Sequence, residues 1–148
     1  MHIKIAAINI SEKKGTQKYG VNKARINNLG IIGDAHAGNW HRQISLLGQE
    51  SIFQFSQKNH RPIKSGEFGE NIILEGMDFS LIQIADRFKI NEVILEVTQI
   101  GKTCHGTGCP IYQAAGDCIM PREGVFTRIV QQGIIKTGDP VTFIPHQE

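Results

Sequence analysis

The residue whose setting most clearly favours chemistry is Cys104, at the start of a glycine-rich segment. A run rich in β-forming residues, 92–100, ends just before it, and the chain continues as GKTCHGTGCP from Gly101. Lys102 and His105 flank the thiol in sequence. Nearby cations favour the thiolate, which is the nucleophilic and metal-binding form of cysteine. Cys104 is therefore predicted to carry sulfur or to hold a soft metal, although a free cysteine also commonly packs as a small hydrophobe.

A wider group of soft ligands surrounds this thiol. Cys104, His105, Cys109 and Cys118 fall close together in the sequence, and four such ligands can form a tetrahedral zinc site. Their spacing matches no standard zinc finger or ribbon, because the usual paired ligands are missing. The alternatives are an iron–sulfur site, a redox pair between Cys104 and one of the other thiols, or simple packing of Cys109 and Cys118.

A polar loop at 33–42, GDAHAGNWHR, carries a second set of candidate residues. Arg42 supplies a planar, permanently charged fork that suits phosphate. His36 and His41 can each act as an acid, a base or a ligand. The alternative interpretation is a solvated loop in which Asp34 caps a turn.

Two further segments add polar side chains. The glycine-rich segment 65–71, SGEFGEN, ends in Glu70 and Asn71, and its glycines would let backbone amides approach a ligand closely. It lacks the Gly-Lys-Ser/Thr ending of a phosphate-binding loop, so a plain turn is the alternative. Arg122 and Arg128 lie on a turn and on the strand after it, where an arginine is more often solvated or ion-paired than a ligand.

The elements that must position these residues are mostly short strands. Alternating or apolar runs, separated by glycine, proline, asparagine and aspartate, predict a mainly β fold, a barrel or a sandwich. Apolar periodicity predicts one clear helix at 48–58, and a short helical turn is expected at 111–115. No repeat or linker divides the chain, so a single domain, 1–148, is expected. The expected strands are 2–10, 43–47, 71–74, 81–85, 87–90, 93–98, 125–130 and 141–144.

The bulk composition limits the class of protein. The chain has 148 residues, of which 40% are apolar and 20% charged, and a formal net charge of +2, ordinary values for one globular domain. This weak, scattered positive charge does not predict nucleic-acid binding. No apolar stretch is long enough for a membrane span, and the N-terminus is too strand-like for a signal peptide. All three cysteines fall within 104–118, which does not fit a secreted disulfide framework, so a cytoplasmic location is expected.

In this order, the segments described above resemble the MOSC family, the molybdenum-cofactor sulfurase carboxy-terminal domain. The resemblance rests on the ordered set rather than on one motif, and it spans nearly the whole chain. It implies a MOSC-type β-barrel with a few short helices, and it implies that Cys104 is the family's characteristic cysteine. The matching segments are 33–38 (GDAHAG), 41–47 (HRQISLL), 66–71 (GEFGEN), the approach to Cys104, 124–129 (GVFTRI) and 138–141 (GDPV).

The resemblance also implies a cofactor. In MOSC proteins the characteristic cysteine is thought to receive sulfur or to bind the molybdenum of a pterin cofactor, the molybdenum cofactor (molybdopterin). Soft sulfur ligands suit molybdenum, while arginine, lysine or backbone amides suit the phosphate of the pterin. Other polar groups would orient these or donate to the pterin ring. The candidate cofactor-binding residues are Lys18, Asp34, His36, Arg42, Glu70, Asn71, Lys102, Arg122 and Arg128.

Three functions follow from the resemblance and the residues. The favoured one is a cofactor carrier or sulfur relay acting through the Cys104 thiolate, with molybdenum-cofactor biosynthesis or desulfurase proteins as partners. Pyridoxal phosphate would then act only in a separate desulfurase, since no such domain is visible here. The second is a molybdenum-dependent reductase of N-hydroxylated compounds, as in the amidoxime-reducing relatives, although no electron-delivery module is visible. The third is a non-catalytic metal-binding or interaction module built on Cys104, His105, Cys109 and Cys118.

Overall fold

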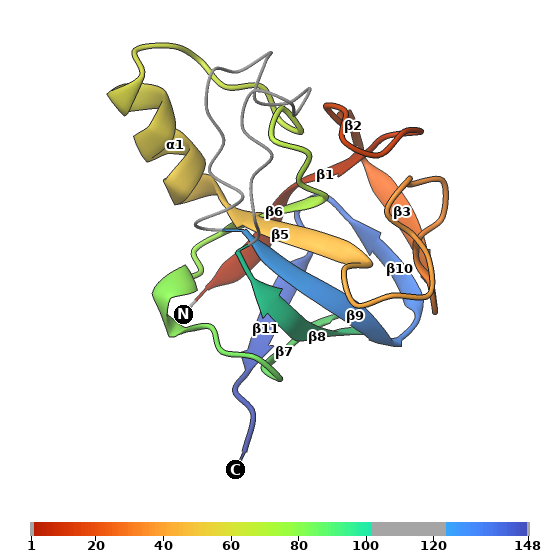
Figure 1. Ribbon diagram of the computed structural model, residues 1–148. Helices are drawn as coiled ribbons and strands as arrows, with labels where there is room; N and C mark the ends of the chain where they lie inside the picture. Colours follow the sequence, from red (N-terminus) through yellow and green to blue (C-terminus); the bar gives the residue numbers. More distant parts are fainter. Residues whose placement is uncertain (1, 102–123, 148) are drawn as a thin grey trace.

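Seven strands of the computed structural model close into a β-barrel (Figure 1). The structure describes residues 2–101 and 124–147. Within them the order around the barrel is β11-β7-β8-β9-β5-β6-β1, and the ring closes because β1 also pairs with β11. The prediction of a mainly β fold built on a barrel is confirmed. The barrel strands are β1 (Ile3–Ile10), β5 (Ile44–Gly48), β6 (Ile72–Glu75), β7 (Arg87–Ile90), β8 (Val93–Ile100), β9 (Val125–Gln131) and β11 (Pro140–Ile144).

The helix α1 (Gln49–Lys58) joins the one parallel pair among these barrel strands, β5 and β6. Parallel neighbours need a crossover instead of a hairpin, and α1 makes it along the outside of the barrel (Figure 1). This confirms the predicted helix at 48–58, whereas the turn predicted at 111–115 lies outside the described residues. No helix in the described part of the chain is long and apolar enough to cross a membrane.

A three-stranded sheet lies beside the barrel, in the order β10-β3-β4. The sequence did not predict β3 (Lys23–Asn27) or β10 (Gly133–Lys136), because each is short and Gly133 resembles a turn residue. Their long-range antiparallel pairing stabilises both, with Ala24 and Ile26 turned to the core. The remaining strands are β4 (Gly30–Ile31), which pairs with β3, and β2 (Tyr19–Val21), which extends β1.

The strand predicted at 81–85 is wrong. A single 3-10 turn, η1 (Phe79–Leu81), begins the segment. Asp86 then accepts a hydrogen bond from the backbone N–H of Gln83 at 2.8 Å, which folds the chain back on itself. Ala85 has a positive φ of 79°, which an extended strand does not adopt. The local turn contacts therefore override the apolar alternation.

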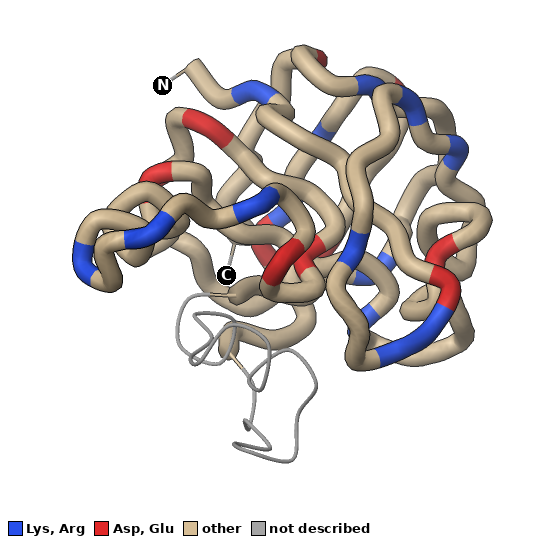
Figure 2. The backbone as a smooth tube through the Cα atoms, turned by 90° about the horizontal axis from the view of Figure 1, so that it is seen from above, with Lys and Arg blue, Asp and Glu red and all other residues tan. Residues whose placement is uncertain are grey.

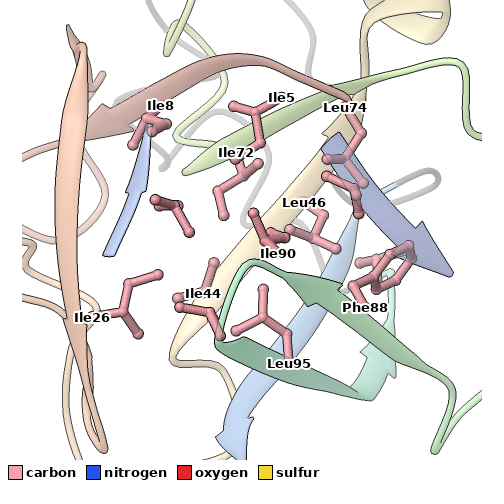
Figure 3. Close-up of a cluster of buried hydrophobic side chains, with 14 of the residues drawn as sticks. Ile5, Ile8, Ile26, Ile44, Leu46, Ile72, Leu74, Phe88, Ile90 and Leu95 are labelled. Atoms are coloured by element: carbon pink, nitrogen blue, oxygen red, sulfur yellow. The ribbon is translucent and has the colours of Figure 1, made fainter. Parts of the chain in front are cut away.

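The barrel is filled by aliphatic side chains that alternate with outward-facing residues along the strands. Figure 3 shows them converging from several strands. Phe88 closes this core, with its ring 5.2 Å from that of Phe143. The fully buried members include Ile5, Ile8, Ile26, Ile44, Leu46, Ile72, Leu74, Ile90 and Leu95.

A second, smaller apolar cluster ties α1 to the outside of the barrel. It contains Leu47, Phe55, Phe68 and Phe126. The rings of Phe55 and Phe68 meet edge to face, with centroids 4.9 Å apart, a favoured aromatic geometry. The cluster thereby fixes the segment around Phe68 and the start of β9 against the helix.

Candidate functional site

The described ends of β8 and β9 lie side by side. The backbone N–H of Gly101 donates to the carbonyl of Gly124 at 2.7 Å, so the described residues on either side of 102–123 are adjacent. The described part of the candidate site is built around these two strand ends. Six predicted site residues lie outside the described residues: Lys102, Cys104, His105, Cys109, Cys118 and Arg122.

The polar loop predicted at 33–42 is held against β9 by the residue that follows it. The side-chain oxygen of Gln43 accepts from the backbone N–H of Ile129 at 2.8 Å. Its Nε2 donates to the carbonyl of Gly38 at 2.8 Å. One buried amide therefore fixes the position of the whole loop relative to the barrel.

His41 connects this loop to the end of β8. Its Nε2 lies 2.8 Å from Oε1 of Gln99, and Nε2 of Gln99 donates to the carbonyl of Gly101 at 2.7 Å. Since the Gln99 oxygen faces the ring, Nε2 of His41 carries the proton and donates. The hydroxyl of Thr98 donates to the carbonyl of His41. The loop and the strand end thus form one hydrogen-bonded unit.

Arg42 lies on two aromatic rings beside these strand ends. Its guanidinium carbon is 4.6 Å from the ring centroid of Trp40 and 5.5 Å from that of Phe126 on β9. Lys14 adds a second cation, 4.7 Å from the Trp40 ring. Within the described part of the chain, the buried Nε of Arg42 has no hydrogen-bond partner. A buried donor left unpaired costs about 1–3 kcal/mol, so this guanidinium is placed for an acceptor that the described residues do not supply.

Lys18, Asp34 and His36 meet in a buried polar cluster. The Lys18 ammonium lies 2.7 Å from Oδ1 of Asp34, 3.1 Å from the hydroxyl of Ser11 and 2.9 Å from Nδ1 of His36. The side chains of both Lys18 and Asp34 are fully buried. Burial alone would raise the pKa of Asp34, but the hydrogen bond and charge of Lys18, with the Ser11 N–H, hold it below its usual value. The ion pair therefore remains charged at neutral pH.

Glu70 closes the glycine-rich loop on itself. Its two carboxyl oxygens accept the backbone N–H groups of Gly66 and Phe68, at 2.9 and 3.1 Å. The side chain has no solvent exposure, and this burial raises the pKa of Glu70 to about 7, against the lowering effect of the two N–H groups. Glu70 thus acts on the described residues as a loop anchor.

Asn71 joins three strands of the barrel wall. Its Oδ1 accepts from the backbone N–H of Ser45 on β5 at 3.0 Å, and its Nδ2 donates to the carbonyl of Asn9 on β1 at 3.1 Å. Nδ2 of Asn9 is buried, and no described residue pairs with it. The predicted residues Glu70 and Asn71 are therefore engaged with the chain itself.

Arg128 forms an ion pair with a neighbouring strand of the barrel. Its Nη2 lies 2.8 Å from Glu96, which also pairs with Arg87 at 3.1 Å on the outer face of the barrel. Burial would raise the pKa of Glu96, but the two guanidinium groups hold it below its usual value. Figure 2 shows Lys and Arg scattered along the described chain, so the two cations at Trp40 form a local feature. No group of three or more His, Cys, Asp or Glu side chains that could hold a metal occurs in residues 2–101 and 124–147.

The sequence matches a model of a known protein family. The family model described as the MOSC domain matches residues 33–142. The chain belongs to the MOSC domain family. The matched region runs from the polar loop to β11, so it contains both Arg42 and the strands that flank 102–123. A comparison with curated proteins finds no match.

Solved structures share the fold of this MOSC domain. YuaD from Bacillus subtilis superposes with a TM-score of 0.83 at 20% identity, covering 99% of this chain and 98% of that one. YiiM from Geobacillus stearothermophilus gives 0.76 at 20% identity, covering 96% and 75%. YiiM from Escherichia coli gives 0.68 at 17% identity, covering 100% and 72%. At these identities the likeness establishes the fold.

Three residues of the MOSC domain site were not predicted from the sequence. Lys14 and Arg42 both lie over the ring of Trp40. A reason to select Trp40 was present in the sequence, since it is the only tryptophan and lies in the polar loop next to His41. Gln99 and Ser11 gave no signal, because their roles come from contacts with residues far away in the sequence. The structure thus brings Lys18, Asp34 and His36 together, and it places Arg42 separately, on Trp40 and Phe126.

This arrangement combines an anion-binding group with a fixed aromatic surface. Arginine binds phosphate or carboxylate through paired N–H groups, and stacking on Trp40 restricts the guanidinium before any ligand arrives. The neighbouring Lys18–Asp34 pair carries no net charge, so among the residues that the structure describes Arg42 and Lys14 supply the positive charge at Trp40. The described residues can therefore bind and orient an anionic group beside the strand ends.

Proposed function

We propose that this MOSC domain binds the molybdenum cofactor through the Cys104 thiolate and acts as a cofactor carrier or sulfur relay. The observation that supports the proposal is the position of Arg42 and the hydrogen bonding of its Nε. Its buried Nε lacks a partner among the described residues, and it lies beside β9, which with β8 flanks the segment containing Cys104. The proposal includes a cytoplasmic location, where thiols remain reduced.

The residues present fit such a cofactor. A thiolate suits molybdenum as a soft ligand, and Arg42 suits the phosphate of the pterin because of its fork of donors. When bound, the cofactor would supply a redox-active metal whose coordination a thiolate can complete. Arg42 would bind the anionic group, and Trp40 would keep the guanidinium in position. His41 and Gln99 would keep the loop attached to the end of β8.

The sulfur-relay form of the proposal needs a partner that carries a persulfide. The Cys104 thiolate would attack the terminal sulfur of the partner's persulfide, and the partner's cysteine would leave as a thiolate. The new persulfide on Cys104 would then hold the transferred sulfur, with no external oxidant or reductant. A separate pyridoxal-phosphate desulfurase would supply the donor persulfide.

The test is a titration of the apoprotein with released molybdenum cofactor under anaerobic conditions. A charge-assisted contact is worth about 1.5–3 kcal/mol, so Arg42→Ala is expected to weaken binding roughly ten- to a hundredfold. Arg42→Lys should recover only part of the affinity, because lysine lacks the bidentate fork. Arg128→Ala is the matched control, since Arg128 already pairs with Glu96, and it should leave binding unchanged.

Two outcomes would contradict the proposal. Equal affinities for wild type and Arg42→Ala would show that Arg42 does not bind the cofactor. Full molybdenum occupancy in Cys104→Ser would show that another residue holds the metal, because a hydroxyl is a poor ligand for a soft metal.

Thiol reactivity and metal content separate the remaining alternatives. A limiting alkylating agent should label Cys104 before Cys109 and Cys118, because alkylation rate follows the thiolate fraction. About one equivalent of zinc, with tetrahedral ligation, would favour the non-catalytic metal module. Turnover of N-hydroxylated compounds by the loaded protein with an electron donor would favour the reductase.

A further inference from the structure

The Lys18 ammonium donates hydrogen bonds to other residues of this chain. An ammonium has three N–H donors and no acceptor. The three donors of Lys18 have three acceptors in hydrogen-bond range: Oδ1 of Asp34, the hydroxyl of Ser11 and Nδ1 of His36. The side chain is fully buried. The resemblance had made Lys18 a candidate for phosphate binding, but this geometry gives it a different task.

The contact with His36 determines where the imidazole proton lies. Of the two basic groups, Lys18 is the charged one, because it is 2.7 Å from Asp34 whereas Nδ1 of His36 is 3.8 Å away. An ammonium only donates, so Nδ1 of His36 must accept at 2.9 Å. In a neutral imidazole one nitrogen accepts and the other carries the proton. The proton is therefore on Nε2.

We propose that Lys18 is a positioning residue that holds His36 as the uncharged tautomer with its proton on Nε2. The Nε2–H group then acts as a hydrogen-bond donor without a charge. Toward the proposed cofactor it would favour an acceptor atom, such as a carbonyl, oxo or phosphate oxygen, over a donor. That last step rests on the proposed cofactor function, whereas the tautomer itself does not.

The surroundings of the ring support this assignment. The ring of His36 stacks on that of Trp40, with a centroid distance of 6.3 Å and an interplanar angle of 6°. Nε1 of Trp40 donates to the carbonyl of His36 at 2.8 Å. A proton on Nδ1 would point at the ammonium, which opposes a charged ring. Among the described residues, the charged groups in contact with His36 or with its stacking partner are Lys18, Asp34, Lys14 and Arg42.

The glycine-rich loop explains how Lys18 is itself held in place. The backbone N–H of Lys18 donates to the carbonyl of Gly66 at 2.8 Å. Gly66 has a φ of +86°, and a Cβ there would overlap the carbonyl of Lys18, so no larger side chain fits. Glu70 fastens this loop through the N–H of Gly66. The GEFGEN segment thus supports Lys18, which in turn orients His36.

The test is long-range ¹⁵N–¹H correlation spectroscopy on the ligand-free protein, with His36→Gln used to assign the ring signals. Wild-type His36 should show the Nε2–H tautomer and remain neutral through the pH range around 6.5 in which an ordinary histidine titrates. In Lys18→Gln, which keeps a neutral donor, the ring should keep this tautomer but titrate in the ordinary range. In Lys18→Met it should populate both tautomers as well.

Every result bears on the proposal. A proton on Nδ1, or a charged ring in the wild type at about pH 6.5, would overturn it even if neither variant folds. Titration of Lys18→Gln identical to wild type would also overturn it. Because the measurement needs no cofactor, an Nε2–H tautomer in a protein that binds no molybdenum cofactor would reject the proposed function and keep the role of Lys18.

Discussion

Replacing Glu70 by Gln isolates the energetic effect of a buried carboxyl group. Glu70 has no solvent exposure, and its two oxygens accept the N–H groups of Gly66 and Phe68. Gln is nearly isosteric but offers only one acceptor, so one backbone N–H would face an amide NH₂ group. That loss costs about 1–3 kcal/mol at every pH. The informative quantity is how the difference in unfolding free energy between wild type and Glu70→Gln changes with pH.

Glu70 makes stability fall as pH rises. Its pKa is raised from 4.5 to about 7 in the folded protein, so the folded state binds more protons than the unfolded state between these values. Folding stability from this group is therefore greatest below about 4.5 and is lost as pH rises through about 7. The shift corresponds to about 3 kcal/mol. Gln does not titrate, so the variant lacks this dependence.

Urea denaturation of both proteins from about pH 4 to about pH 8 measures the effect. The stability advantage of wild type over Glu70→Gln should shrink by about 3 kcal/mol across this range. Other carboxyl groups also titrate with lowered pKa values, namely Asp34, Asp86 and Glu96. They are present in both proteins, so their contributions cancel in the stability difference. Parallel stability curves would refute the view that Glu70 is charged at a cost in the folded state.

Two further predictions concern stability. Gly66→Ala should destabilise by about 3 kcal/mol or more in urea denaturation, since it combines a positive φ with overlap on Lys18. Gly15→Ala, with positive φ but open space, should cost only about 1 kcal/mol; equal costs would contradict the clash. His146→Ala should cost about 1 kcal/mol at neutral pH, because Nδ1 of His146 lies 2.6 Å from the buried Asp86. The lowered pKa of Asp86 means that this contribution disappears as pH falls through it, so a difference that persists in acid would exclude the contact as its source.

The elements that the sequence predicted well are those with simple local patterns. The strands β7 and β9 follow from alternation, and α1 follows from apolar periodicity. By contrast, β3 and β10 exist because they pair with each other across most of the chain, which no local pattern contains. At 81–85 the alternation was present, but side-chain contacts of Asp86 produced a turn.

The candidate site divides in the same way. Asp34 and His36 could be selected because their residue types and loop position point to chemistry. The role of Lys18 could not be predicted, because a lysine in a polar loop looks solvated until the fold encloses it with Ser11. For Arg42 the chain itself supplies stacking partners but leaves Nε unpaired, and that state depends on the packing of Trp40 and Phe126.

The closure of the barrel has a consequence for how the chain folds. β1 pairs with β11 through only two residue pairs, Ile3 with Val141 and Lys4 with Pro140, so the seam joins segments near opposite ends of the sequence. Loop-closure entropy delays contacts of this kind, and topologies rich in them fold slowly. Until β11 docks, the start of β1 at Ile3 and Lys4 keeps an open edge that can pair with another chain. During synthesis this part of β1 stays unpaired until β11 has emerged, and an unpaired strand edge favours aggregation in that interval.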